Sequence, residues 1–188
     1  VDIFFVISGF VITQSIYKDY LIKKRIDIKY FYIKRFRRII PNLLFILSFT
    51  FILFLFIGPP QITLWNDFLT SLLGISNLYF LFSDKGYFYN IFDNPFAHTW
   101  SLGVEEQFYL IYPFLIWIFV LKKDQKKSVN YFLILMSILS CLSFLAFLIS
   151  YQFNTNFAYY LLPARFWEIG LGCMTYLSLS LVKGKRFQ

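Results

Sequence analysis

The chain has 188 residues, of which 59% are hydrophobic, 23% are aromatic and only 15% are charged, and its formal net charge is +8. A mean hydropathy of +0.62 is too high for a soluble domain of this length. The composition therefore excludes a soluble globular protein, and the positive charge does not indicate a nucleic-acid partner because the basic residues lie between apolar segments.

Long apolar segments divide the chain. A hydrocarbon core about 30 Å thick requires roughly 20 apolar helical residues. The segments of that character predict membrane spans at 3–17, 39–57, 100–121, 129–150 and 161–182. The first is short because the sequence opens inside it without an initiator Met, so we interpret residues 1–188 as one partial domain, truncated at the N-terminus and, we expect, at the C-terminus.

The basic residues predict how these spans are oriented. All Lys and Arg residues except Lys85 and Arg165 fall in 18–38, 122–127 and 183–186. The positive-inside rule places such segments in the cytoplasm, so 58–99 and 151–160 face outward. The segment 62–82 is long enough to span but carries polar residues, and we expect it to be a re-entrant or interfacial helix. The predicted fold is an all-α polytopic transmembrane helix bundle with about five spans.

The stretch "YIKRFRRIIP", residues 32–41, begins the second span with a basic cluster. Arg35 and Arg38 are three residues apart and lie on one helix face, where two guanidinium groups can hold phosphate oxygens. The alternative is that the cluster only anchors the helix to anionic lipid, at about 1 kcal/mol per basic residue. The cluster by itself does not decide between these interpretations.

The stretch "HTWSLGVEEQFYLIYP", residues 98–113, places adjacent carboxylates in an apolar helix. Glu105 shares a helix face with Ser101, Tyr109 and Tyr112, whereas Glu106 points about 100° away. We predict that Glu105 faces the bundle interior and that Glu106 faces elsewhere. The alternative is that both acids only complement the helix dipole in its first turns.

Further charges lie at the predicted outer ends of the spans. Arg165 and Glu168 are three residues apart, and an ion pair between them is the simplest interpretation. Gly9 is expected to allow close helix packing, and the two cysteines, Cys141 and Cys173, are expected to be packing residues with no metal site nearby. We also expect these charged residues to line one cavity at this side, formed by Asp2, His98, Glu105, Arg165 and Glu168.

Four blocks, "VDIFFVISGFVI", "FYIKRFRRIIP", "HTWSLGVEEQFYLIYP" and "PARFWEIGLG", together resemble the membrane-bound acyltransferase 3 family in order and spacing. The resemblance implies acyl transfer from acyl-coenzyme A to sugars and other hydroxyl-bearing acceptors. It also implies that Arg35 and Arg38 serve the coenzyme A donor from the cytoplasmic side. The family has an essential histidine in a first transmembrane helix upstream of these blocks. His98 belongs to a different block, so we expect residues 1–188 alone to be inactive.

The predicted function is that of a multi-pass cell-membrane O-acyltransferase that moves an acetyl group from acetyl-coenzyme A to a hydroxyl of a cell-surface carbohydrate. The candidate catalytic residues are Glu105, Asp2 and His98, and the candidate acceptor-binding residues are Trp100, Ser101, Arg165 and Glu168. Membrane lipid is a further expected partner; no metal is expected. The alternatives are a transporter or flippase of a lipid-linked sugar, which predicts pseudo-symmetric halves, and a scaffold that binds anionic lipid through 18–38.

Overall fold

The computed structural model describes residues 1–23, 25–57, 63–83, 94–120 and 125–186, and every regular element among them is helical. The long helices are α1 (Asp2–Lys23), α2 (Ile28–Ile57), α5 (Trp100–Val120), α6 (Gln125–Phe153) and α8 (Leu162–Arg186). The short elements are α3 (Leu64–Leu72), α4 (Ser76–Phe82), the 3₁₀ turn η1 (Ala97–Thr99) and α7 (Thr155–Tyr160). The prediction of an all-α fold is confirmed.

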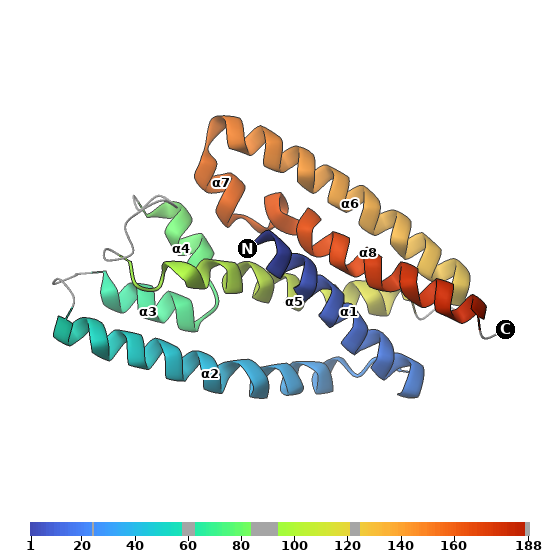
Figure 1. Ribbon diagram of the computed structural model, residues 1–188, viewed down its shortest axis with the longest axis horizontal. Helices are drawn as coiled ribbons and strands as arrows, with labels where there is room; N and C mark the ends of the chain where they lie inside the picture. The colour runs from blue at the N-terminus through green and yellow to red at the C-terminus, as the bar shows by residue number, and fades with distance from the viewer. Residues whose placement is uncertain (24, 58–62, 84–93, 121–124, 187–188) are drawn as a thin grey trace.

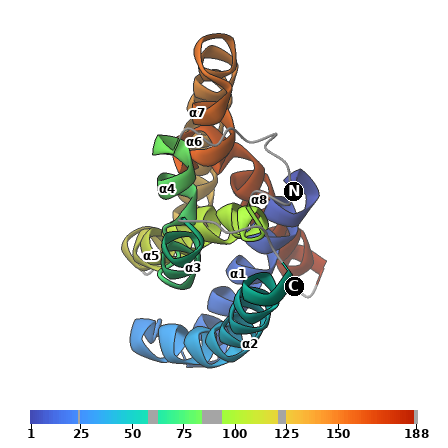
Figure 2. The same ribbon diagram turned by 90° about the vertical axis from the view of Figure 1, so that its left-hand side faces the viewer.

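The helices form three levels, which Figures 1 and 2 show from two directions. α6, α7 and α8 lie on one side, α1 and α5 cross the middle, and α2 lies on the opposite side with α3 next to it (Figures 1 and 2). α8 packs against both α6 and α1. The middle level therefore lies between the two outer ones, and it buries Ser8, Thr13 and Glu105.

Two of the described helices, Ile28–Ile57 and the Lys127–Phe153 part of α6, are long and apolar enough to cross a membrane. Both expose large apolar side chains along their length, such as Phe45 and Phe56 on α2 and Ile138 and Leu142 on α6. Exposed apolar surface on this scale marks a membrane or protein contact. These two helices are the candidate spans that length and composition identify.

Glycines let α1 and α8 approach each other closely. A Cβ atom at Gly9 would collide with the carbonyl oxygen of Ile169, and one at Gly172 would collide with the carbonyl oxygen of Val6. The thiol of Cys173 is buried in the same contact, with its sulfur 3.4 Å from the Gly9 carbonyl oxygen. The predicted packing roles of Gly9 and Cys173 are confirmed.

The structure refines or corrects three local predictions. The helix of the predicted span 39–57 extends back to Ile28, because Asp27 caps it by accepting a hydrogen bond from the Tyr30 N–H at 2.9 Å. The segment 62–82 contains two short helices rather than one, and they are separated at Gly74, whose φ of +68° suits glycine. Cys141 is exposed, so its interpretation as a packing residue was wrong.

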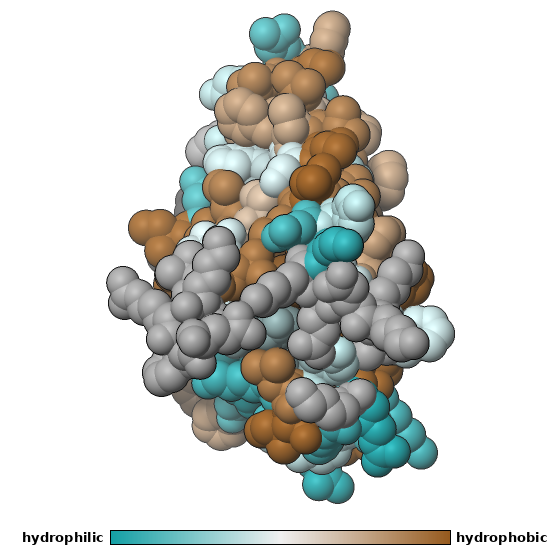
Figure 3. Space-filling model, turned by 90° about the vertical axis from the view of Figure 1, so that its right-hand side faces the viewer, coloured by the Kyte–Doolittle hydropathy of each residue, from teal (hydrophilic) through white to brown (hydrophobic). Residues whose placement is uncertain are grey.

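The helix ends that adjoin the basic segments lie near one another, as the predicted orientation requires. The end of α1, the start of α2, the start of α6 and the end of α8 all lie at the right-hand end of the molecule in Figure 1. Lys23 at the end of α1 lies over the Tyr30 ring near the start of α2, 3.9 Å from its centroid. Figure 3 views this end, where hydrophilic surface (teal) lies among hydrophobic side chains (brown). The helix ends next to the basic segments thus share one end of the molecule.

Candidate functional site

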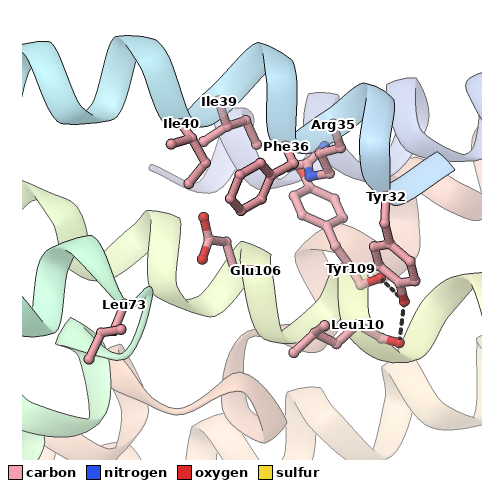
Figure 4. A pocket seen from close by; sticks show the side chains of 9 residues that line it. All are labelled: Tyr32, Arg35, Phe36, Ile39, Ile40, Leu73, Glu106, Tyr109 and Leu110. Carbon is pink, nitrogen blue, oxygen red and sulfur yellow. Dashed lines mark hydrogen bonds between the residues drawn. The ribbon is translucent and has the colours of Figure 1, made fainter. Parts of the chain in front are cut away.

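A pocket of about 300 Å³ lies between α2 and α5, with the turn between α3 and α4 at its edge (Figure 4). Its walls are mostly apolar and carry one basic and one acidic group. The lining residues are Tyr32, Arg35, Phe36, Ile39, Ile40, Leu73, Glu106, Tyr109 and Leu110. Ligand pockets typically combine apolar walls with a few placed polar groups, so this cavity is a candidate binding site.

Arg35 occupies this pocket by stacking on an aromatic ring. Its guanidinium carbon lies 3.1 Å from the centroid of the Tyr109 ring, as Figure 4 shows. Stacking on an aromatic face fixes the guanidinium plane and leaves the N–H groups at its edge available. Arg35 is therefore oriented in advance for an anionic or carbonyl-bearing ligand.

A proline in α5 explains why α2 docks here. Pro113 has no N–H, so the carbonyl of Tyr109, four residues earlier, lacks its helical hydrogen bond. The Tyr32 hydroxyl lies 3.3 Å from this oxygen and donates at 2.9 Å to the neighbouring carbonyl of Leu110. The hydrogen bonds drawn in Figure 4 thus tie α2 to the part of α5 where backbone acceptors are free.

Glu105 lies behind the pocket in a buried polar network. Its side chain is 3% exposed, and its Oε2 accepts a hydrogen bond from the Tyr109 hydroxyl at 3.1 Å. The Ser8 hydroxyl of α1 hydrogen-bonds to the same Tyr109 oxygen, and farther along the two helices Tyr112 and Thr13 pair at 2.6 Å. The buried position agrees with the prediction for Glu105. Its Oε1 has no hydrogen-bond partner among the described residues.

Glu106 faces the pocket. The sequence predicts only that it points away from Glu105 and assigns it no role. Its carboxylate points toward α2 in Figure 4, on the same side of α5 as the Arg35 guanidinium. Its Oε2 lies so close to Gly74 that a Cβ atom on residue 74 would collide with this oxygen. The two acids face different surroundings, as a rotation of about 100° per residue predicts. Residue spacing along α5 does not predict which element Glu106 contacts.

A second charged group lies where α8 meets the start of α1. Arg165 donates to Oε1 of Glu168 at 2.5 Å and to Oδ1 of Asp2 at 3.3 Å. The predicted ion pair is therefore confirmed, and it also ties α8 to α1. The Arg165 guanidinium is surrounded by the rings of Tyr159, Phe147 and Trp100, at 4.8, 5.2 and 6.0 Å from their centroids. Its Nε and Oε2 of Glu168 are buried without hydrogen-bond partners among the described residues.

The residues expected to line one outer cavity do not all contact one another. Glu105 contacts Tyr109 and interacts electrostatically with Arg35, whereas Arg165 pairs with both Glu168 and Asp2. Their described contacts thus form two groups. The sequence could not separate them because depth along a helix does not specify which neighbour the side chain meets.

Arg35 and Glu105, which the sequence places toward opposite ends of the predicted spans, lie close together in the structure. Tyr109 contacts both residues and lies four residues beyond Glu105, which is about 6 Å along the axis. It is nine residues, or about 14 Å, from the start of the 21-residue α5. Because α2 begins at Ile28, Arg35 is a helical residue, and it lies beside the middle of α5. Arg38 is exposed and does not line the pocket, so the expected pair of adjacent forks is not formed there.

His98 lies in η1 and Ser101 in the first turn of α5. The Ser101 hydroxyl donates to the backbone carbonyl of His98 at 3.3 Å; His98 is exposed and Ser101 is partly buried. Partial desolvation of the imidazole lowers the pKa of His98 below its ordinary value, and a hydrogen bond to the Pro95 backbone opposes this shift. His98 is therefore neutral near pH 7, and among the described contacts it joins neither charged group.

Residues 1–187 match the family model described as an acyltransferase domain. O-acetyltransferase OatA of Staphylococcus aureus (strain NCTC 8325 / PS 47) is 31% identical over 178 residues, which are 93% of this chain and 29% of that protein. Peptidoglycan O-acetyltransferase OatA of Listeria monocytogenes serovar 1/2a is 36% identical over 122 residues, which are 64% of this chain and 20% of that protein. The chain therefore spans less than a third of the length of these relatives. No solved structure matches it.

Proposed function

The chain belongs to the acyltransferase 3 family, and from this membership we propose that it is the membrane part of an O-acyltransferase. The proposed reaction moves an acetyl group from acetyl-coenzyme A to a hydroxyl of a cell-wall glycan. Its support is that the relatives carry the names O-acetyltransferase and peptidoglycan O-acetyltransferase. The observation that carries it is the pocket in which a stacked guanidinium meets apolar walls at the middle of α5.

Arg35 is the proposed donor-binding residue. Acyl-coenzyme A combines phosphates with a long, largely uncharged arm, and arginine forks bind phosphate oxygens bidentately. Arg38 is exposed one turn beyond Arg35 on α2, and the positive charge of this part of the helix attracts an anionic donor. In this arrangement the phosphates bind around Arg38 and Arg35, and the arm that carries the thioester extends along the apolar wall of α2.

The Ser8–Tyr109–Glu105 network is the proposed positioning device for the acceptor. In the reaction the acceptor oxygen attacks the thioester carbonyl carbon, the carbon–sulfur bond breaks, and the departing thiolate receives a proton. This step requires a base for the hydroxyl proton and donors for the oxyanion. Oε1 of Glu105, which has no hydrogen-bond partner among the described residues, is suited to accept a hydrogen bond from the attacking hydroxyl.

The second charged group is the proposed entry for the acceptor. Trp100 offers an aromatic face, and Arg165, Glu168 and Asp2 offer polar atoms of both signs close to it. Sugars combine hydroxyl groups with apolar faces, so these side chains are suited to them. His98 in η1 and Ser101 in the first turn of α5 are proposed to border this entry.

A multi-pass location in the cell membrane is also part of the proposal. In it α1, α2, α5, α6 and α8 cross the bilayer, and α3 and α4 enter it without crossing. The donor then approaches from the cytoplasmic side, where the basic segments lie, and the acceptor approaches from the opposite side. Both would meet at the level of Tyr109.

Titration of the purified full-length protein with coenzyme A tests the donor site. Arg35→Lys keeps the charge but loses the planar fork and its stacking, so the dissociation constant should rise about tenfold, or about 1.4 kcal/mol. Arg37→Lys is the matched control because Arg37 is an exposed residue of the same helix that does not line the pocket. Equal affinities for both variants and the wild type would refute the donor assignment.

A further inference from the structure

Glu106 carries the further inference, which rests on the proposed donor function. We infer that Glu106, held in place by Gly74, makes the part of this pocket beside it selective for the amide- and hydroxyl-bearing arm of the donor and excludes the phosphates from that part. The carboxylate would accept hydrogen bonds from the arm's N–H and O–H groups. It is thus a specificity-determining residue for donor binding.

The first support is the arrangement of charge in the pocket. Arg35 and Glu106 line the same cavity of about 300 Å³, yet no ion pair joins these two described residues. The two charges attract each other at longer range, but without a close ion pair the hydrogen-bonding atoms of both groups remain available to a ligand. A ligand that satisfies both must present an acceptor to Arg35 and a donor to Glu106.

The second support is the size of the cavity. Ligand pockets range from roughly 300 to 1,000 Å³, so a cavity of about 300 Å³ accommodates only part of a coenzyme. The apolar side chains between the two charges, such as Phe36 and Ile39, suit the methyl and methylene groups of the arm. A phosphate beside Glu106 would face a like charge at short range.

The third support is that the fold holds Glu106 in its position. α3 ends in a Schellman motif, in which the Ile75 N–H donates to the Thr70 carbonyl at 3.0 Å and the Gly74 N–H donates to the Ser71 carbonyl at 3.3 Å. Gly74 at φ +68° is the left-handed residue of this motif, and its missing side chain leaves the space that Oε2 of Glu106 occupies.

A further contact fixes the turn against α5. The Gln107 amide donates to Oδ1 of Asn77 at 3.0 Å, and Asn77 in turn donates to the Tyr160 carbonyl at 2.9 Å. Gly103 allows this approach, because a Cβ atom there would lie 2.7 Å from Oδ1 of Asn77 and 3.2 Å from the Gly74 carbonyl oxygen. The turn and the carboxylate are therefore positioned as one unit.

The test compares two halves of the donor as separate probes. The full-length wild-type protein, Glu106→Gln and the control Asp19→Asn are each titrated with coenzyme A, pantetheine and adenosine 3′,5′-bisphosphate. Asp19 is a matched control because its substitution also removes one negative charge, and it lies on α1 outside the pocket. In Glu106→Gln the ratio of the pantetheine to the bisphosphate dissociation constant should rise at least tenfold, and in Asp19→Asn it should not change.

The outcomes separate the inference from the proposed function. If the wild type does not bind coenzyme A, the proposed function and the inference both fail. If it binds coenzyme A and Glu106→Gln leaves the ratio unchanged, only the inference fails.

A second variant tests the positioning by Gly74 and replaces the first if Glu106→Gln does not fold. Gly74→Ala places a methyl group where the carboxylate lies, so it should raise the same ratio. In the double variant Gly74→Ala/Glu106→Gln the ratio should not rise beyond that of Glu106→Gln, because both changes act through one carboxylate. Additive effects would show that Gly74 does not act through Glu106.

Discussion

Tyr109 is the residue at which three helices meet. The Arg35 guanidinium of α2 stacks on its ring. Its hydroxyl hydrogen-bonds to Ser8 of α1 and to Glu105 of its own helix, and its carbonyl is near the Tyr32 hydroxyl. A single side chain thereby connects the proposed donor pocket to the proposed acceptor network. The proposed roles of the two adjacent acids differ, because Glu105 lies behind this residue and Glu106 lies beside it in the pocket.

Glu105→Gln tests the role of the buried acid. The substitution keeps the size of the side chain but alters a polar contact next to the reacting groups. We expect the rate of acyl transfer by the full-length enzyme to fall tenfold or more, while the affinity for coenzyme A is retained. The measurements are a transfer assay at saturating donor and a binding titration.

The paired variant Glu106→Gln decides whether the two acids have been assigned correctly. At saturating coenzyme A it should transfer faster than Glu105→Gln, since its proposed role is in binding. If Glu105→Gln is fully active and Glu106→Gln is inactive at saturation, the roles must be exchanged. If both are fully active, the acids serve only the helix dipole.

At the scale of the elements, α8 organises the bundle because it packs against both α1 and α6. Its contact with α1 depends on backbones that approach without intervening side chains, at Gly9 and Gly172. The ion pair of Arg165 with Asp2 joins the same two helices at the other end of the contact. α1 carries Ser8, so the position of α8 determines how the network around Glu105 is assembled.

Gly172→Ala tests the importance of this crossing. The added methyl group meets the Val6 carbonyl oxygen, and overpacking of this kind costs roughly 1–3 kcal/mol. We expect a lower midpoint of thermal unfolding for the full-length protein in detergent. Leu171→Ala is the control, because Leu171 is the neighbouring residue on α8 and is 43% exposed. An unchanged midpoint for Gly172→Ala would show that the helices separate at little cost.

At the scale of the whole molecule, the arrangement of the helices bears on how the protein sits in a membrane. The helix ends next to the basic segments lie at one end (Figure 1), and the short helices α3, α4 and α7 lie away from it. This matches the orientation proposed from the positive-inside rule. Lys85 and Lys123, which contribute to the predicted orientation, lie outside the described residues.

Cysteine labelling at the two ends of α6 tests the orientation on described positions. Lys127 and Gln152 are both exposed and lie near opposite ends of this helix. In a background where the exposed Cys141 is replaced, Lys127→Cys should react with a membrane-impermeant reagent only from the cytoplasmic side and Gln152→Cys only from the outer side. Reaction of both from one side would refute the crossing of α6 and the proposed separation of donor and acceptor.

Much of the fold was predictable from the sequence because the relevant signals are local. The length of an apolar run, the position of basic residues and the four motif blocks predicted the all-α class, the approximate positions of the long helices and the family. The Arg165–Glu168 pair was predictable for the same reason, since residues three apart on a helix are neighbours in any fold. The burial of Glu105 also followed from the polar face that it shares with Tyr109.

The site itself was decided by the tertiary structure. The stacking of Arg35 on Tyr109, the contact of Glu106 with Gly74 and the separation of Glu105 from Arg165 all join or divide residues on different helices. Periodicity specifies which residues share a face of a helix, but the tilt of that helix and the neighbour that its face meets depend on packing between distant segments. The sequence by itself therefore determined the helices and their chemistry, and only their packing determined which charges meet in one pocket.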